Sequence, residues 1–123
     1  MTAARSLAIA MALAAVGSSV ATAAEHVRRL PGRELAVRLA GMEFTDDVHW
    51  AYGFERSGRL RSVSMGTLRT GSWRVRGDEL CLDGGPDGAR CFQVWAAGDS
   101  IELRRGDGSL PDAGTLRKPQ ARR

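Results

Sequence analysis

Residues 71–82 read GSWRVRGDELCL and contain two stretches in which apolar and polar side chains alternate. Trp73 and Val75 are each followed by an arginine, and Leu80 and Leu82 flank a cysteine. A period of two is typical of β-strands that bury one face, because successive side chains point to opposite faces. A Gly-Asp dipeptide, which favours a turn, separates the two stretches. The segment therefore predicts two antiparallel strands joined by a tight turn.

The same period of two continues through most of the chain from Met42 onward. One predicted strand carries three aromatic residues on a single face: Trp50, Tyr52 and Phe54. Further strands are predicted at residues 60–67, at 90–95, at 101–103 and around Leu116. Within residues 60–67, Leu60 is out of phase with Val63 and Met65, which predicts a β-bulge between them.

A short helix is predicted ahead of the strands, over Pro31–Ala40. Proline is favoured in the first helical turn, and Gly41 is suited to the C-terminal cap. The apolar residues of this segment also alternate, so a strand is the competing prediction. The preceding residues Glu25–Arg33 are polar and are predicted to form a frayed lead-in.

The arrangement of these elements predicts the fold class. About six to eight short strands with frequent turns predict a mainly β fold, a small antiparallel meander closed as a barrel or folded as a sandwich, with one short N-terminal helix. The 15 glycines among 123 residues suit many tight turns. We expect a single β-rich domain at residues 25–119, followed by a loose basic tail at 120–123.

Residues 1–24 have the three parts of a secretory signal peptide. Arg5 supplies the positive charge, residues 7–16 are apolar, and Ala21-Thr22-Ala23 provides a cleavage site near Ala24. The apolar run is shorter than the roughly 20 residues that span a bilayer, although an uncleaved anchor is the alternative. We expect a product of about 99 residues, in the bacterial periplasm or medium, that spans no membrane after cleavage.

Two cysteines, Cys81 and Cys91, follow the predicted signal peptide. In an oxidising compartment such a pair predicts a structural disulfide, and the spacing fits neither a zinc site nor a Cys-x-x-Cys redox motif. If the two cysteines face each other across a hairpin, Leu80 faces Phe92 and the turn is centred on Pro86.

The charge pattern limits the expected partners. The net charge is +4, and it falls to +3 without residues 1–24, which contain one arginine and no acid. Arginines alternate with acids along the chain, and the only dense basic run is at residues 117–123. Nucleic-acid binding is therefore not expected, whereas a mildly cationic surface could face an anionic envelope polymer or be merely solvated.

Residues Asp46-Asp47-Val48-His49 form the only cluster of acids with a histidine. Such side chains could bind a metal ion or orient a general base. If a strand includes them, Asp47 and His49 share a face and Asp46 points away, so the three groups do not converge. His26 is the only other histidine, and there is no Gly-x-Ser-x-Gly motif. We expect no catalytic residues, no metal site and no cofactor.

Three aromatic residues are candidates for contact with a ligand or partner: Trp50, Tyr52 and Trp95. Trp50 and Tyr52 could line a cavity in an eight-stranded barrel, but a domain of this size also needs them to fill its core. Trp95 shares a face with Cys91, opposite Phe92. It is expected either to pack under the N-terminal helix or to mark an exposed contact patch.

Residues 71–81, followed by Cys91-Phe92-Gln93-Val94, resemble small secreted proteobacterial domains of unknown function. Those domains combine a signal peptide, a short helix and a meander with Gly-x-Trp, Leu-Cys and Cys-aromatic-x-Val strands. The resemblance covers most of residues 33–117 and implies a periplasmic β-domain, without catalytic or ligand residues. A looser similarity exists to small periplasmic β-barrel lysozyme inhibitors, although the chain has no inhibitory loop motif.

These features predict a soluble periplasmic, non-catalytic module that binds a protein or an envelope component through one face. The alternative is a small-molecule carrier with an apolar barrel interior, and an enzyme or enzyme inhibitor is the third possibility. A filled interior with an exposed apolar patch would favour the binding module, whereas an empty apolar cavity would favour the carrier.

Overall fold

The computed structural model describes residues 2–4, 8–17 and 26–120. Arg5, the predicted cleavage site at residues 21–24 and the last three residues of the predicted tail lie outside the described residues. Residues 2–4 and 8–17 contain no helix or strand, and their side chains are exposed.

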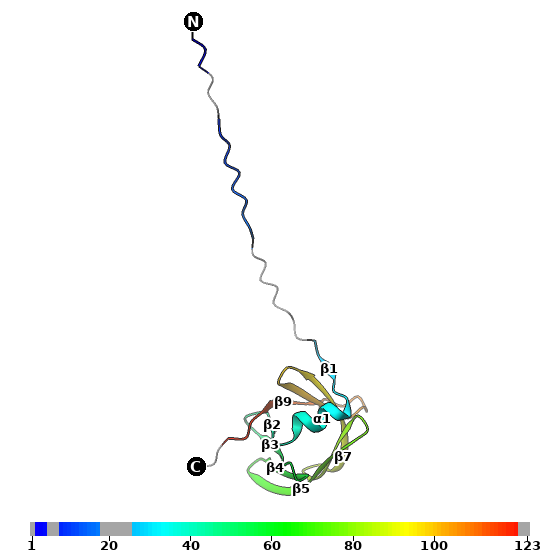
Figure 1. Ribbon diagram of the computed structural model, residues 1–123. Helices are drawn as coiled ribbons and strands as arrows, with labels where there is room; N and C mark the ends of the chain where they lie inside the picture. The colour runs from blue at the N-terminus through cyan, green and yellow to red at the C-terminus, as the bar shows by residue number, and fades with distance from the viewer. Residues whose placement is uncertain (1, 5–7, 18–25, 121–123) are drawn as a thin grey trace.

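Eight antiparallel strands form a closed up-and-down barrel (Figure 1). The strands are β2 (Glu43–Thr45), β3 (Trp50–Phe54), β4 (Arg59–Ser64), β5 (Thr67–Arg76), β6 (Glu79–Gly85), β7 (Gly88–Ala97), β8 (Ser100–Arg104) and β9 (Asp112–Arg117). Each of these strands pairs with the next one along the chain, and β9 pairs with β2 to close the ring. The predicted mainly β fold is confirmed, and it is a barrel rather than a sandwich.

A short strand precedes the barrel, where the sequence predicts a frayed lead-in. β1 (Arg28–Arg29) pairs with the C-terminal end of β7, and the next residue, Leu30, is completely buried. The Leu30 N–H donates to the carbonyl oxygen of Val94 over 2.8 Å. The prediction for residues 28–33 was wrong because one apolar side chain in a polar stretch fixes the segment to the barrel.

The helix α1 (Gly32–Leu39) covers one end of the barrel and lies inside the ring of strands in Figure 1. Leu35 and Leu39 are buried against the barrel interior, whereas Val37 is exposed. This spacing of buried residues matches a helical period and excludes the competing strand. Gly41 follows the helix with a φ of 77°, as the predicted C-terminal cap requires.

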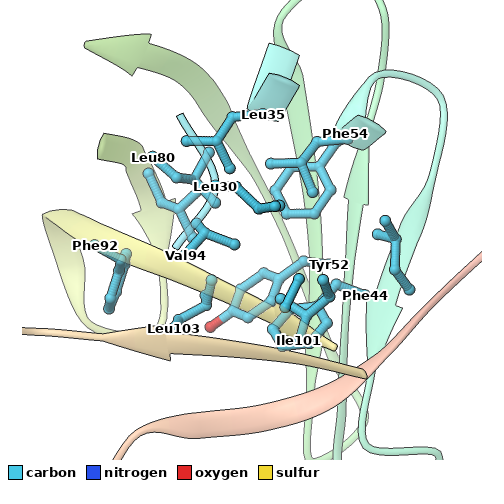
Figure 2. Packing of buried hydrophobic residues seen from close by; sticks show 14 of the residues in the cluster. Leu30, Leu35, Phe44, Tyr52, Phe54, Leu80, Phe92, Val94, Ile101 and Leu103 are labelled. Carbon is cyan, nitrogen blue, oxygen red and sulfur yellow. The ribbon is translucent and has the colours of Figure 1, made fainter. Parts of the chain in front are cut away.

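Inward-facing side chains from the strands and α1 fill the barrel. Figure 2 shows Leu35 pointing from α1 toward Leu30 and Leu80, with Tyr52 and Leu103 further along the interior. The buried cluster comprises Leu30, Leu35, Leu39, Phe44, Tyr52, Phe54, Leu60, Leu80, Leu82, Phe92, Val94, Ala96, Ile101, Leu103 and Leu116. Burial of this apolar surface is the main source of stability for so small a domain.

The predicted strand at residues 60–67 is confirmed as far as Ser64, but its extension to residue 67 and its bulge were wrong. The chain reverses at Met65 and Gly66, whose φ angles are 49° and 81°, so β4 ends at Ser64 and β5 begins beyond the turn. β4 pairs with both neighbours in continuous register, without a bulge. Alternation from Leu60 therefore places Ser62, rather than Val63, in the interior.

The hairpin of β6 and β7 has the predicted register. Leu80 faces Phe92, and Cys81 faces Cys91, to which it is joined by a disulfide. The register shifts beyond Leu82, where β5 and β6 lie unusually close together. A Cβ atom on Gly71 of β5 would lie 1.8 Å from the Asp83 carbonyl oxygen, so only glycine fits at this position.

Candidate binding surface

Trp50 and Tyr52 lie inside the barrel, at the end opposite α1. The rings of Trp50 and Tyr52 are 5.4 Å apart, and the ring of Phe44 lies 4.8 Å from that of Trp50. Tyr52 is 8% exposed, and Trp50 is half-buried. Both side chains pack against the core, and their contact with a ligand or partner stays a prediction.

The end of the barrel near Tyr52 is closed by a charged cluster. Arg105 lies 2.9 Å from the Asp112 carboxylate and 3.5 Å from that of Asp87, and its guanidinium lies over the Phe92 ring at 5.5 Å. Burial raises the pKa of the Tyr52 hydroxyl, the carboxylates of Asp112 and Asp87 raise it further, and Arg105 opposes them.

Trp95 lies on the outer wall of the barrel, away from Trp50 and Tyr52. Its ring packs under the Arg104 guanidinium at 4.3 Å, and its indole N–H donates to the Gln93 side-chain oxygen. It faces Arg29 of β1 and therefore does not pack under α1. Of the two predicted environments, the structure places Trp95 on the outside, partly covered by arginine.

The Asp46–His49 cluster forms the turn that leads into β3. One carboxylate oxygen of Asp46 accepts the backbone N–H groups of Val48, His49 and Trp50, and the other lies 3.0 Å from His49 Nδ1. Burial would raise the Asp46 pKa, but these hydrogen bonds outweigh it and hold the pKa well below its usual range. Asp47 instead pairs with Arg117, so Asp46 is the acid that contacts His49.

One group of possible metal ligands occurs among the described residues, and it contains the disulfide. Ligand atoms of Glu79, Cys81 and Cys91 lie within 4.8 Å of one another. Both cysteine sulfurs are joined to each other, so neither is a thiolate that could bind a metal ion. A hollow of about 260 Å³ lies over this disulfide, between the outward-facing Arg74 and the rim residue Arg90.

A larger hollow, of about 420 Å³, lies on the outer wall of the barrel over β2, β3 and β4. We name it the outer groove. Its lining comprises Gly41, Met42, Glu43, Ala51, Gly53, Phe54, Glu55, Arg61, Val63, Pro119 and Gln120. The small outward-facing residues Ala51 and Gly53 form the floor, because their inward-facing neighbours Tyr52 and Phe54 belong to the core.

Exposed apolar side chains continue the outer groove across the wall. Val63 faces Ala51 on one side and Leu68 on the other, and Leu68 is 53% exposed. The adjacent turns add Val48 and Met65, which are 78% and 77% exposed. We name Val48, Val63, Met65 and Leu68 the outer apolar patch. The sequence pattern did not identify this surface, although a glycine inside a strand is a signal for close approach by another group.

The molecule is thus a small closed β-barrel with a filled interior, a disulfide and a hollowed apolar surface on its outer wall. No protein-family model, curated protein or solved structure matches the chain. Within residues 26–120 and the two described N-terminal segments, no helix is long and apolar enough to cross a membrane. The disulfide is consistent with an oxidising extracellular or periplasmic location.

Proposed function

We propose that the protein is a periplasmic or secreted, non-catalytic binding module that recognises a protein or an envelope component through its outer wall. The observation that carries this proposal is the combination of a filled barrel interior with an exposed apolar surface on the outside. Proteins that work alone in solution rarely expose contiguous apolar patches without a binding role.

The alternative role as a small-molecule carrier is less well supported. A carrier needs an interior cavity, and the side chains of the core occupy the interior of this barrel. Both hollows described above lie on the outer wall. An enzyme or enzyme inhibitor remains the third candidate.

The proposed location rests on the signal-like residues 1–24 together with the disulfide. Cleavage near Ala24 should release a product with no free thiol into the periplasm or medium. Intact mass measurement of protein recovered from that fraction tests this proposal. A product that keeps Met1 and sediments with membranes would instead identify residues 1–24 as an anchor.

Capture from an envelope extract, followed by reconstitution, tests the binding function. Immobilised protein should retain a specific component, which after purification binds the soluble protein at a defined stoichiometry in calorimetry. Native mass spectrometry of the recovered protein should show the mass of the polypeptide alone. A tightly retained small molecule, together with no captured macromolecule, would favour the carrier.

A further inference from the structure

The floor of the outer groove depends on a glycine that the fold itself does not require. Gly53 is the fourth of the five residues of β3, and its φ is not in the left-handed region that favours glycine. A Cβ atom there would meet only Arg61, at 3.6 Å from its Cβ and 3.8 Å from its carbonyl oxygen. Both distances are ordinary contacts, so a Cβ atom would fit at this position.

A glycine in a strand interior is costly, because it lowers strand propensity and gives up side-chain packing. Neither the backbone angle nor crowding demands glycine here, and the register on both sides of Gly53 is continuous, without a bulge. A strand glycine often marks a site where another group approaches the backbone closely. Gly53 keeps the groove floor bare at the point where β3 faces Arg61.

The charges around the groove indicate the sign of that group. Glu55 lies 3.4 Å from Arg59, and Glu43 lies 3.7 Å from Arg117, which also pairs with Asp47. Arg61 lines the groove and has no ion pair among the described residues. The groove therefore offers an apolar floor beside Arg61, and the free guanidinium of Arg61 complements an apolar group next to a carboxylate.

The size of the surface indicates a polypeptide rather than a small molecule. The outer apolar patch extends the groove from β3 across β4 to β5, through the paired residues Ala51, Val63 and Leu68. A contact of this kind, apolar in the middle and charged at its edge, is typical of protein interfaces. An extended peptide can reach from the groove floor to the patch.

We propose that the outer groove docks an extended segment of a partner protein, which places an apolar side chain over Gly53 and a carboxylate against Arg61. This inference rests on the proposed binding function and identifies the face and the partner chemistry. The outer apolar patch binds the residues of the segment that follow.

The test uses blocked peptides, acetyl-Ala-X-Asp-X-Ala-amide, in which X is leucine, valine or phenylalanine. Two-dimensional NMR of the protein should show shifts at Ala51, Gly53, Arg61 and Val63 on titration. The same peptides with asparagine in place of aspartate should bind about threefold more weakly, as expected for a partly exposed ion pair. Peptides with alanine at both X positions should cause no shifts.

The variant Gly53→Val tests whether peptide binding is lost because the groove is filled, without destabilising the protein. Valine has a higher strand propensity than glycine, so the variant should melt at a higher temperature than the natural protein. Its two methyl groups fill the floor, so peptide binding should weaken at least about tenfold. Ala113→Val, on the outer wall at β9, is the matched control and should leave binding unchanged.

Arg61→Gln tests the charge, with Arg74→Gln as its control, because Arg74 faces outward on β5 away from the groove. Only the first variant should remove the preference for aspartate over asparagine. Shifts elsewhere, or no shifts with any peptide, would overturn the groove proposal. A captured partner whose binding is unchanged in Gly53→Val and Arg61→Gln would also overturn it, while leaving the binding function in place.

Two other occupants would contradict the proposal in distinguishable ways. Concentration-dependent association in sedimentation velocity that Gly53→Val abolishes would identify a second copy of the chain. Decanoate that binds in the groove while all the peptides fail would identify a small apolar carboxylate.

Discussion

Ser62 is a polar side chain in an apolar interior. Its hydroxyl oxygen is buried and makes no hydrogen bond to any described residue, and the side chain is 1% exposed. A buried polar group without a partner costs free energy relative to an apolar one of similar size. Ser62 thus lowers the stability of the barrel.

Ser62→Ala should therefore raise the free energy of unfolding by about 1 kcal/mol, measured by urea denaturation. Ser64→Ala, at the next inward position of β4, is the control and should change stability little, because Ser64 is only half-buried. A loss of stability in Ser62→Ala would show that the hydroxyl is hydrogen-bonded after all.

Asp46 should make stability depend on pH in the acid range. Its pKa in the folded protein is lower than in the unfolded chain, where an aspartate has a pKa of about 3.9. The stabilisation is therefore complete above that value and is lost as the pH falls below it, because the unfolded chain takes up the proton first.

Asp46→Asn keeps the oxygen that accepts the three backbone N–H groups and removes the charge. Urea denaturation at pH 7, 4 and 3 should show a smaller loss of stability on acidification in this variant than in the natural protein. Parallel curves for the two proteins would show that another carboxylate is responsible.

At the scale of elements, α1 is held by the turn between β5 and β6. The Asp78 carboxylate accepts the N–H of Gly32, the first residue of the helix, over 2.8 Å. Asp78→Ala should lower the free energy of unfolding by about 1 kcal/mol, the usual value of a helix N-cap. Glu79→Ala, one residue further on, should have a smaller effect, and an equal loss in both would rule out the capping role.

The disulfide should contribute a large share of the stability of the β6–β7 hairpin. Cys81 and Cys91 close a short loop, and such a bridge stabilises by roughly 2 kcal/mol. Reduction should lower the melting temperature by about ten degrees. The double variant Cys81→Ala and Cys91→Ala should have a melting temperature close to that of the reduced natural protein, and reductant should not change it. An unchanged melting temperature of the natural protein after reduction would contradict the prediction.

The local sequence pattern predicted most of the strands, but it did not predict for every strand which side chains point into the barrel. Alternation identified β3 and the β6–β7 hairpin because large apolar residues there lie on one face only. β4 carries Leu60 inside and Val63 outside, so the pattern is ambiguous and only the strand pairing in the structure decides it. β1 escaped prediction because a two-residue strand has no period, and its position depends on the burial of Leu30.

The binding surface was harder to predict than the fold. The aromatic candidates Trp50 and Tyr52 are needed in the core, as the sequence allowed, and the outer groove is made of small and charged residues. Its parts, from Gly41 to Gln120, come together only when the barrel closes. The alternation of apolar and polar residues carries no information on whether the first and last strands pair. For the same reason it could not distinguish a barrel from a sandwich.

At the scale of the whole molecule, the seam between β2 and β9 is one of the two shortest pairings in the ring, equal in length to that of β2 with β3. It contains three residue pairs, whereas β4 and β5 share six. Segments with few contacts open with the lowest free energy. Native-state hydrogen exchange should therefore show faster exchange for the amides of β2 and β9 than for those of β5 and β6, and the reverse order would contradict this prediction.

Gly114→Ala should weaken the seam further. A Cβ atom at Gly114 would lie 2.5 Å from the Thr45 carbonyl oxygen, so β9 must move away from β2. Exchange in both strands should accelerate more than exchange in β6. The same acceleration in all strands would show that the barrel opens only as a whole.

The pairing of β2 with β9, which closes the barrel, affects the order in which the chain folds. Each other neighbouring pair of barrel strands is joined by a short connection and can form as soon as its two strands exist, so folding through these local contacts should be fast. Glu43, however, faces Arg117, and a chain made from its N-terminus must produce all seven hairpins before β2 finds its second neighbour. Until then both sheet edges are unpaired, and a growing chain needs protection from association during this interval.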